Sequence, residues 1–349
     1  MERTKKPESL SAQMKRRVDS VKTKKPEYDG DFGQCISTGS TLLDLAISGG
    51  RIRGGGLPGG ILVEVFGPSG VGKTVLLSEI AGAVKRQGGS IRFDDPEARL
   101  NKQFAALFGL NIDKVNYKRP DTIPEVFTGV REWKPPMKKG IIHGSFTDSS
   151  AALSTDMEME DNDAYGMRRA KEFSEELRKT CRIITEKNYL VVCSNQIRDV
   201  VGATQYQEKT KTPGGRGWEF YPSLRLRLST LKKYKTTLEF GNKKEISKIM
   251  GVRTLVEVYK SSIWKPFNTA PITILFDYGI DDIRENLQFI KDFTKNTIYT
   301  CCGAPLDKSM EVSIAAVEDN KLEESLKEEV IELWEEIESK FKTERKPKR

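Results

Sequence analysis

The sequence contains a single histidine and only five cysteines among 349 residues. No two cysteines have the C-x-x-C spacing of common zinc and redox sites, although Cys301 and Cys302 are adjacent. We therefore expect neither a zinc site nor a disulfide framework. Scattered, reduced thiols of this kind are typical of the cytoplasm.

Long hydrophobic runs are also lacking. No apolar stretch approaches the roughly 20 residues that a membrane-spanning helix needs, and no apolar signal segment follows Met1 to Lys6. We therefore expect a cytoplasmic protein with no membrane partner. A hydrophobic fraction of 37% and a charged fraction of 31% fit a globular protein with a highly charged surface. The length allows one sizeable domain plus a smaller one, or two medium ones.

Charge is distributed unevenly along the chain. The net charge is +8, and residues 1–27 hold nine Lys or Arg against four Asp or Glu. Residues 318–338 reverse this balance, with ten acids against two lysines. Apolar residues recur there every three or four positions, which predicts an amphipathic helix with a packing face: Leu322, Leu326, Val330, Leu333, Ile337 and Phe341. Alternatively, the acidic helix is a regulatory tail that repels nucleic acid.

From Ile61 onward, apolar runs alternate with stretches of helical periodicity, which indicates a parallel α/β sheet. Strands are expected at Ile61–Phe66, Ser90–Phe93, Ile141–Thr147, Tyr189–Cys193, Leu224–Leu231, Thr254–Tyr259 and Pro271–Phe276. Helices are expected near 75–86, 100–108, 123–132, 165–186 and 282–293. A further helix over Leu42–Ile47 would be capped by Ser37 to Ser40, and a basic helix is expected near 9–21.

The strongest local pattern is G-x-x-x-x-G-K-S/T, which directly follows the first of these strands and precedes a helix. It comprises Gly67, Pro68, Ser69, Gly70, Val71, Gly72, Lys73 and Thr74. In that context the glycines let backbone N–H groups surround phosphates, and the helix N-terminus adds positive charge. Lys73 would reach the outer phosphates and the Thr74 hydroxyl would bind Mg²⁺. The sequence therefore predicts binding of ATP with Mg²⁺.

Hydrolysis needs further polar groups at neighbouring strand ends. Asp148 follows the strand expected at Ile141–Thr147 and is a candidate second metal ligand. The group that activates water is expected among Asp94, Asp95 and Glu97, of which at least one should be a surface acid that caps a helix. Asn195-Gln196 follows the strand at Tyr189–Cys193, and an amide side chain there could touch the γ-phosphate. His143 is expected to be a packed, hydrogen-bonded residue rather than a catalytic one.

Several further motifs occur in a particular order. Ile36-Ser37-Thr38-Gly39-Ser40 and Leu43-Asp44 are followed by Gly55-Gly56-Leu57-Pro58-Gly59-Gly60, Glu64 and Gly67-Pro68. Asp148-Ser149-Ser150-Ala151-Ala152-Leu153, Asn195-Gln196-Ile197-Arg198, Gly214-Gly215, Phe220-Tyr221 and Ser223-Leu224-Arg225 come later. This series resembles the bacterial RecA recombinases from about residue 36 to 280, and the divergence elsewhere favours a bacteriophage or mobile-element member. The resemblance implies a RecA-type P-loop ATPase core, with a mostly parallel central sheet flanked by helices.

The resemblance also implies roles for matching positions. Glu97 falls on the family's water-activating glutamate, and Phe104 on an aromatic that packs near adenine, although a core role for Phe104 is an equal alternative. Gln196 matches a glutamine that couples the γ-phosphate to a mobile DNA-binding loop. Lys260 matches a lysine that crosses the subunit interface to the neighbour's ATP. The family's second interface lysine is replaced by Ser262, for which Lys265 could substitute.

Two polar segments match the family's DNA loops in position, residues 155–166 and 199–213. Tyr206 could stack or wedge between bases, although an exposed tyrosine with no partner is an equal alternative. The backbone of Gly214 and Gly215 could approach phosphates closely. The helix after the first loop carries Lys171, Ser174 and Arg178 on one face, a spacing that by itself is typical of a solvated face. Matching positions in the family touch phosphates, so the resemblance implies that these residues and Arg198 contact DNA. The basic stretch of Arg225, Arg227, Lys232, Lys233 and Lys235 could attract an incoming duplex, although Glu257 stands where the family is basic.

The sequence thus predicts an N-terminal basic oligomerisation arm (1–34), an ATPase and DNA-binding core (35–280) and a small α-rich C-terminal region (281–349). The expected function is DNA-dependent ATP hydrolysis and strand exchange. Single-stranded DNA, homologous duplex DNA and further copies of the chain in a helical filament would be its partners, in the bacterial cytoplasm or that of a phage-infected host. A hexameric RecA-fold motor and a non-catalytic ATP-binding regulator remain alternatives.

Overall fold

The computed structural model describes residues 33–111, 117–136, 138–155, 166–199, 210–240, 244–341 and Arg345. The expected basic helix near 9–21 and nearly all of the expected arm lie outside these residues. Tyr206 and most of both expected DNA loops also lie outside them.

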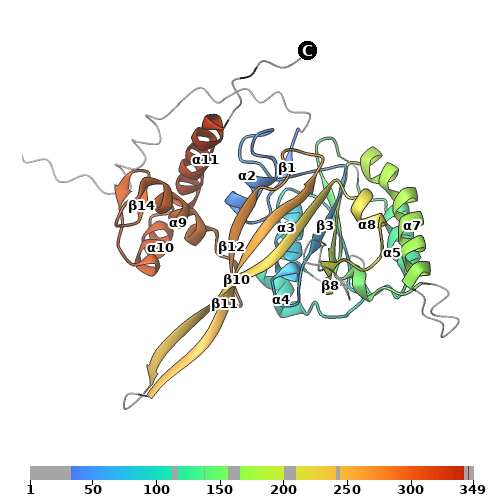
Figure 1. Ribbon diagram of the computed structural model, residues 1–349, viewed down its shortest axis with the longest axis horizontal. Coiled ribbons are helices and arrows are strands. Elements are labelled where there is room, and N and C mark those ends of the chain that lie inside the picture. The colour runs from blue at the N-terminus through green and yellow to red at the C-terminus, as the bar shows by residue number, and fades with distance from the viewer. Residues whose placement is uncertain are drawn as a thin grey trace, which may run out of the picture.

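A nine-stranded sheet runs through the molecule in the order β13–β12–β11–β10–β3–β7–β6–β4–β5 (Figure 1). Its strands are β3 (Ile61–Phe66), β4 (Ile91–Asp94), β5 (Tyr117–Lys118), β6 (His143–Thr147), β7 (Tyr189–Asn195), β10 (Leu224–Phe240), β11 (Lys244–Ser261), β12 (Thr269–Leu275) and β13 (Gly279–Ile280). The strands from β10 to β5 in this order are mutually parallel, whereas β11, β12 and β13 extend the sheet in antiparallel fashion. The predicted α/β class and mostly parallel sheet are confirmed.

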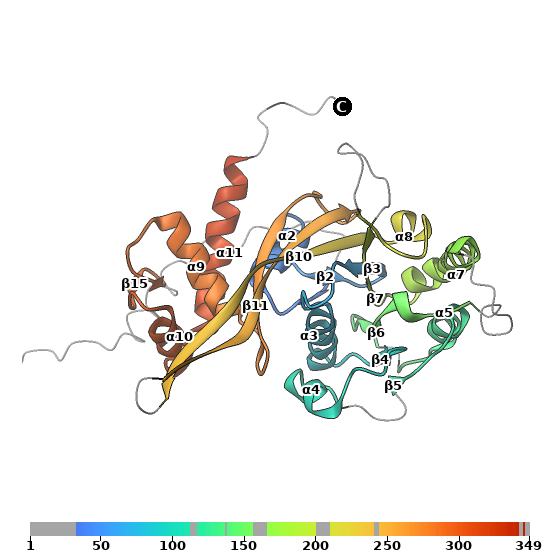
Figure 2. The same cartoon turned by 60° about the horizontal axis from the view of Figure 1, so that its bottom comes forward.

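Helices cover both faces of the parallel part, as Figures 1 and 2 show. One core contains residues of α2 (Thr41–Ser48), α3 (Lys73–Arg86), α4 (Lys102–Leu107) and α9 (Asp282–Thr294). The other contains residues of α5 (Ile123–Glu132), α7 (Gly166–Glu186) and α8 (Gly217–Phe220). Successive β3 residues serve the two cores, with Leu62 in one and Val63 in the other, because side chains alternate along a strand. Within the described ranges, no helix is long and apolar enough to cross a membrane.

Several short elements lie outside the main sheet. Strand β1 (Cys35–Ile36) pairs with β2 (Leu57–Pro58), and Ser40 caps α2 by accepting a hydrogen bond from the Leu43 amide. A 3-10 turn, η1 (Ser150–Ala152), follows β6, and the two-residue strands β8 (Arg198–Asp199) and β9 (Thr210–Lys211) pair with each other. The predicted helix over Leu42–Ile47 is therefore confirmed.

The β10–β11 hairpin is much longer than the sequence predicts. Strands were expected only at Leu224–Leu231 and Thr254–Tyr259, whereas pairing continues outward to Phe240 and Lys244. Beyond the part that pairs with β12, the hairpin projects from the body as a two-stranded ribbon (Figures 1 and 2). Lys235, Thr236, Thr237 and residues 245–249 are exposed, so in these residues no buried face produces the apolar alternation on which strand prediction relies.

The chain ends in a small lobe that packs on the core beside α2 (Figure 1). The lobe contains α9, β14 (Thr300–Cys301), β15 (Ala304–Pro305), α10 (Met310–Asp319) and α11 (Glu323–Lys340). The acidic segment is helical as predicted, and Leu322, Leu326 and Val330 are buried. Phe341, expected on the same stripe, is 76% exposed because it lies just beyond the last residue of α11.

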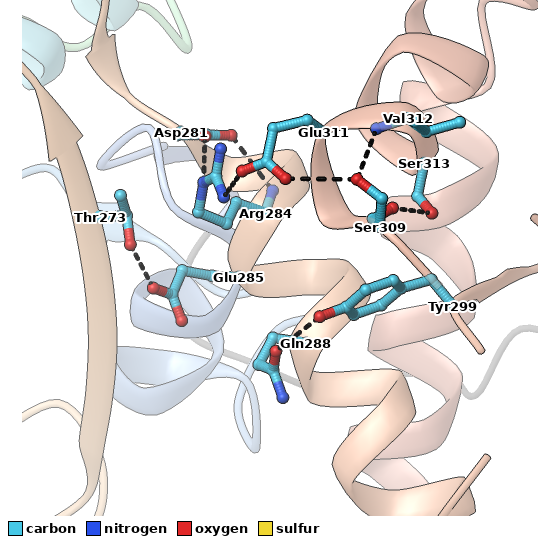
Figure 3. A network of polar contacts seen from close by, with 10 residues as sticks. All are labelled: Thr273, Asp281, Arg284, Glu285, Gln288, Tyr299, Ser309, Glu311, Val312 and Ser313. Atoms are coloured by element: carbon cyan, nitrogen blue, oxygen red, sulfur yellow. Dashed lines mark hydrogen bonds and ion pairs between the residues drawn. The ribbon is translucent and has the colours of Figure 1, made fainter. Parts of the chain in front are cut away.

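Polar contacts of α9 join this lobe to the sheet (Figure 3). The Thr273 hydroxyl of β12 donates a hydrogen bond of 2.5 Å to Glu285 of α9. Arg284, one residue earlier, pairs with Asp281 at 2.7 Å and with Glu311 of α10 at 3.3 Å. On the lobe side, the Tyr299 hydroxyl donates to Gln288 at 3.3 Å. Helix α9 therefore links the rest of the lobe to the sheet.

Candidate functional site

The glycine loop connects β3 directly to α3. Gly72 is the N-cap of α3 with φ of 93°, a left-handed conformation that favours glycine, and a Cβ there would lie 2.1 Å from Cδ1 of Ile274. Gly70 also has a left-handed φ of 77°, but a Cβ there would meet nothing within 4 Å. The loop conformation therefore requires glycine at position 72 for lack of space, whereas the loop surface at Gly70 faces open space.

A cavity of about 350 Å³ lies beside this loop. Its lining includes most of the residues predicted to bind and hydrolyse ATP: Ser69, Gly70, Gly72, Lys73, Thr74, Glu97, Phe104, Asp148 and Gln196. Gly67 and Pro68 contribute carbonyl oxygens that accept hydrogen bonds of 2.9 and 2.7 Å from Lys73 Nζ. Val71 is buried in the core and its carbonyl accepts from Thr254. The structure thus gathers residues from five separate segments at one edge of the sheet.

Lys73 lies among charges of both signs. Burial lowers its pKa, the carboxylates of Asp148 and Glu97 oppose that change, and the positive charge of Arg99 adds to the lowering. Its hydrogen bonds to the two loop carbonyls keep the ammonium group over the loop. An arriving phosphate group would compete with those carbonyls for the same donor.

Two oxygen atoms suited to bind a metal ion lie side by side in the cavity lining, one from Thr74 and one from Asp148. Thr74 Oγ1 donates a hydrogen bond of 2.5 Å to Asp148 Oδ2, and Ser194 donates to the other carboxylate oxygen of Asp148. Hydroxyl and carboxylate oxygens are the ligands that Mg²⁺ prefers in nucleotide sites, where one or two protein ligands suffice beside phosphates and water. Thr74 and Asp148 therefore fit Mg²⁺.

The three candidate acids after β4 have different surroundings. Asp94 is fully buried and pairs with Arg92 through two hydrogen bonds of 2.8 and 2.9 Å. Asp95 is also buried and accepts hydrogen bonds from the Leu100 amide and the Tyr117 hydroxyl. The alternative of a surface acid is therefore wrong for both. Only Glu97 lines the cavity, where it accepts a 3.2 Å hydrogen bond from Ser149 and pairs with Arg99.

Phe104 has contacts on two sides. It lines the cavity and packs partly against the core, with its ring 5.0 Å from that of Phe108. His143 is buried, as predicted, and its Nδ1 accepts a 3.0 Å hydrogen bond from the Ser90 amide. Burial lowers the pKa of His143, which favours the neutral ring. Its ring lies 6.2 Å from that of Trp133 and 6.4 Å from that of Tyr189, edge to face with both.

A buried polar network leads away from Gln196, and the sequence did not predict it. Asn195, the preceding residue, donates 2.9 Å to Glu64 and 3.1 Å to the Pro213 carbonyl. Arg225 donates 2.6 Å to the same Glu64 and 3.3 Å to Thr212. Residues 212 and 213 are the last two residues of the second expected DNA loop. The network therefore connects the end of β7 to the end of that loop.

Lys260 does not line the cavity beside the glycine loop, which we call the nucleotide-type cavity. It lines a second cavity of about 560 Å³, together with Arg225, Arg227 and Tyr259. Its Nζ donates hydrogen bonds of 2.8 Å to the carbonyls of Glu219 and Phe220. Burial lowers the pKa of Lys260, and the positive charge of Arg225 lowers it further. Lys265, the expected substitute for the second interface lysine, pairs with Glu338 of α11 at 3.2 Å.

The residues predicted to contact DNA fall in two places. Lys171, Ser174 and Arg178 line one shallow cavity of about 240 Å³ with Tyr221. Arg198 lies opposite Lys211 in the β8–β9 pair, whose strands flank the undescribed segment that contains Tyr206.

Gly214 and Gly215 have left-handed φ values of 100° and 71°. Added Cβ atoms would lie 2.6 Å from Cδ1 of Trp218 and 2.5 Å from Cβ of Ala170, respectively. Close packing of the loop end on α7 and α8 is therefore a reason for glycine at both positions that the sequence did not reveal.

The basic stretch on β10 is only partly available to a partner. Arg225 is buried and paired with Glu64, so its predicted role in attracting a duplex is wrong. Arg227 is half exposed and pairs with Glu257 at 2.9 Å. Lys232, Lys233 and Lys235 are exposed on β10.

One cluster of metal-type ligands lies in the C-terminal lobe. The Sγ atoms of Cys301 and Cys302 and a carboxylate oxygen of Glu329 lie within 4.8 Å of one another. Three ligands are one short of a closed tetrahedral zinc site. The hydrogen bond with Cys302 and burial raise the pKa of the Cys301 thiol, so the protonated form is favoured. The predicted absence of a structural zinc site therefore stays a prediction.

Comparison with known proteins gives a consistent result. Residues 23–281 match the sequence profile described as the RecA N-terminal domain. The RecA protein of Thermus thermophilus is 32% identical over 252 residues, which cover 72% of this chain and 69% of that protein. That of Acholeplasma laidlawii is 31% identical over 257 residues, covering 73% and 72%. That of Thioalkalivibrio sulfidiphilus is 33% identical over 254 residues, covering 72% and 69%. The profile match ends where α9 begins.

Proposed function

The chain belongs to the RecA family, and we propose that it is a DNA-dependent ATPase that catalyses strand exchange in homologous recombination. Copies of the chain form a helical filament on single-stranded DNA in the bacterial cytoplasm, with ATP held between neighbours. The observation that carries this proposal is the meeting of Lys73, Thr74, Glu97, Asp148 and Gln196 in one cavity. These are the groups that phosphate binding, metal binding, water activation and phosphate sensing require.

The proposed hydrolysis assigns one task to each side chain. Lys73 leaves the loop carbonyls and donates to the outer phosphates, while loop amides hold the rest of the triphosphate. Bound between Thr74 and Asp148, Mg²⁺ would neutralise charge that develops on the phosphate oxygens. Glu97 orients the attacking water and accepts its proton, and the Ser149 hydroxyl at 3.2 Å helps to hold the carboxylate in place.

The network around Glu64 supports coupling between ATP and DNA. Gln196 reaches the cavity, and its neighbour Asn195 joins Glu64 to the carbonyl of Pro213. We propose that contact between Gln196 and the γ-phosphate shifts this strand end and thereby orders the segment between residues 199 and 213 for DNA. Because such coupling is reciprocal, DNA would also favour the ATP-bound state.

DNA would lie across α7 and the ends of the two loops. Lys171, Arg178 and Arg198 contact phosphates, Ser174 adds a hydrogen bond, and Tyr206 stacks on bases. The backbone of Gly214 and Gly215 approaches the strand from the end of the second loop. Contacts of this kind read no base edges, so binding should be independent of sequence and should weaken with salt.

Lys260 is proposed to complete the neighbour's active site. It lines the second cavity and donates hydrogen bonds to the carbonyls of Glu219 and Phe220. In the filament it would exchange these carbonyls for phosphates of the adjoining ATP, in the manner of an arginine finger.

The test combines strand exchange with electron microscopy. With ATP, Mg²⁺ and a circular single strand, the wild-type chain should transfer a homologous linear duplex strand and form filaments. Lys260→Ala should form DNA complexes but hydrolyse ATP slowly. Closed rings in the micrographs would support a hexameric motor instead, and ATP binding without hydrolysis would support a regulator.

A further inference from the structure

A second cation stands in the nucleotide-type cavity beside Lys73. Arg99 lines this cavity and forms an ion pair of 2.7 Å, from its Nε to Oε2 of Glu97. Its side chain is 73% exposed, whereas that of Glu97 is 15% exposed. The guanidinium is close enough to Lys73 to contribute to the lowered pKa of that lysine. Arg99 is therefore paired with the candidate catalytic base and lies within electrostatic range of the candidate phosphate-binding lysine.

The turn that carries Arg99 is fixed at its base. The Asp95 carboxylate accepts the Leu100 amide at 2.8 Å, and the Ala98 amide donates 3.1 Å to the Asp95 carbonyl. Ala98 itself has a left-handed φ of 52°, which turns the chain sharply between Glu97 and Arg99. The backbone at Arg99 is thus held beside the cavity, while the exposed side chain above it keeps room to move.

The charges in the cavity favour a change of partner for Arg99. Without a ligand, the cations Lys73 and Arg99 face the anions Glu97 and Asp148. A triphosphate with one Mg²⁺ still brings net negative charge, and its terminal group offers several oxygens to a planar guanidinium fork. The Arg99 end of the ion pair is largely exposed, so water can replace part of its contacts when the guanidinium changes partner.

From this arrangement we propose that Arg99 binds the terminal phosphate of ATP in its own subunit and acts as a catalytic residue for hydrolysis. The inference rests on the proposed ATPase function and deepens it. When Arg99 moves to the phosphate, Glu97 is released from its ion pair and becomes free to accept a proton. The same cation therefore holds the base inactive in the absence of ATP and stabilises charge in its presence.

The chemical step balances as follows. The water oxygen forms a bond to the γ-phosphorus, and the bond between that phosphorus and the β–γ bridging oxygen breaks. ADP leaves with the electron pair on that oxygen, and the water proton goes to Glu97. Arg99 keeps its own protons throughout and stabilises the charge spread over the terminal oxygens in the transition state.

The test compares Arg99→Ala with a matched control, Arg182→Ala. Arg182 is likewise exposed and pairs through its Nε with a glutamate, Glu186, at 2.7 Å. It lies near the C-terminal end of α7 and does not line the nucleotide-type cavity. For Arg99→Ala we expect the kcat for ATP to fall on the order of 10²-fold or more, with Arg99→Lys intermediate and Arg182→Ala unchanged. An unchanged kcat in Arg99→Ala would overturn the proposal while wild-type hydrolysis still upheld the ATPase.

A second measurement separates phosphate contact from positioning of Glu97. In a Glu97→Gln background, which should bind nucleotide without hydrolysing it, the affinities for ATP and ADP are measured with and without Arg99→Ala. We expect ATP affinity to fall about tenfold or more and ADP affinity to stay the same. Equal changes for both nucleotides, or none, would contradict a contact with the terminal phosphate.

Discussion

Arg225 Nε lies 2.6 Å from Oε2 of Glu64, and both side chains are buried in the sheet. The guanidinium also lies 4.7 Å from the centre of the Phe66 ring, and Asn195 donates a hydrogen bond to Oε1 of Glu64. This ion pair therefore joins strands β3, β7 and β10 beneath the candidate site. It also makes the two residues strongly dependent on each other.

Removal of Arg225 alone should destabilise the protein severely. Arg225→Met leaves Glu64 as a buried, uncompensated charge, which typically costs about 3–5 kcal/mol. The double variant Glu64→Gln, Arg225→Met removes both charges and should recover most of that loss. Urea denaturation gives the free energies of unfolding. A single variant as stable as wild type would mean that the pair is not buried in solution.

The two cavity-lining glycines should differ in their tolerance of alanine. Gly72→Ala combines left-handed strain with a Cβ only 2.1 Å from Cδ1 of Ile274, so we expect a loss of about 3 kcal/mol or more. Gly70→Ala meets open space and should lose only about 1–2 kcal/mol from strain. Thermal unfolding of both variants without nucleotide tests this order, and equal losses would argue against the loop conformation described.

Asp44 should give stability a distinct pH dependence. Burial raises its pKa to about 6, although hydrogen bonds from Ser37 and Thr38 oppose the shift. Between about pH 4 and 6 the folded state then binds more protons than the unfolded state, so the free energy of unfolding falls as pH rises. Asp44→Asn should reduce that fall by about 3 kcal/mol. Parallel pH profiles for wild type and variant would refute the raised pKa.

Hydrolysis should depend on Asp148 more than on its hydrogen-bond donor Ser194. Asp148→Asn removes a carboxylate that fits Mg²⁺ beside Thr74, so it should raise the Mg²⁺ concentration needed and lower kcat by about 10²-fold or more. Ser194→Ala keeps the carboxylate and removes only its support, an effect of about 10- to 100-fold at most. Rates measured across a Mg²⁺ titration decide the order. A larger loss in Ser194→Ala would reverse these roles.

The sequence predicted the parts of the site that depend on local spacing. Lys73 and Thr74 belong to a contiguous motif, and Asp148 and Gln196 follow strands whose carboxyl ends share one edge of the sheet. Glu97 could be separated from Asp94 and Asp95 only through resemblance, because three acids after one strand look alike. The structure distinguishes them by their partners.

Other features depend on contacts between distant residues. The β10–β11 ribbon carries exposed polar side chains, so hydrophobic periodicity does not mark its length. In the sequence, Arg99 cannot be distinguished from any surface arginine. Only the structure shows that the turn at Ala98 lets it pair with Glu97. Glu64 reads as an isolated charge in an apolar strand, and only its buried partner Arg225, 161 residues away, explains it. The phage or mobile-element origin stays a prediction.

The most direct test of the central claim is ATP hydrolysis with and without single-stranded DNA, for the wild type and Glu97→Ala. We expect DNA to stimulate the wild type strongly. The variant should lose hydrolysis but keep ATP-dependent DNA binding, because Glu97 acts on water and the phosphate-binding residues remain. Wild-type hydrolysis that ignores DNA, or a variant as active as wild type, would contradict the account.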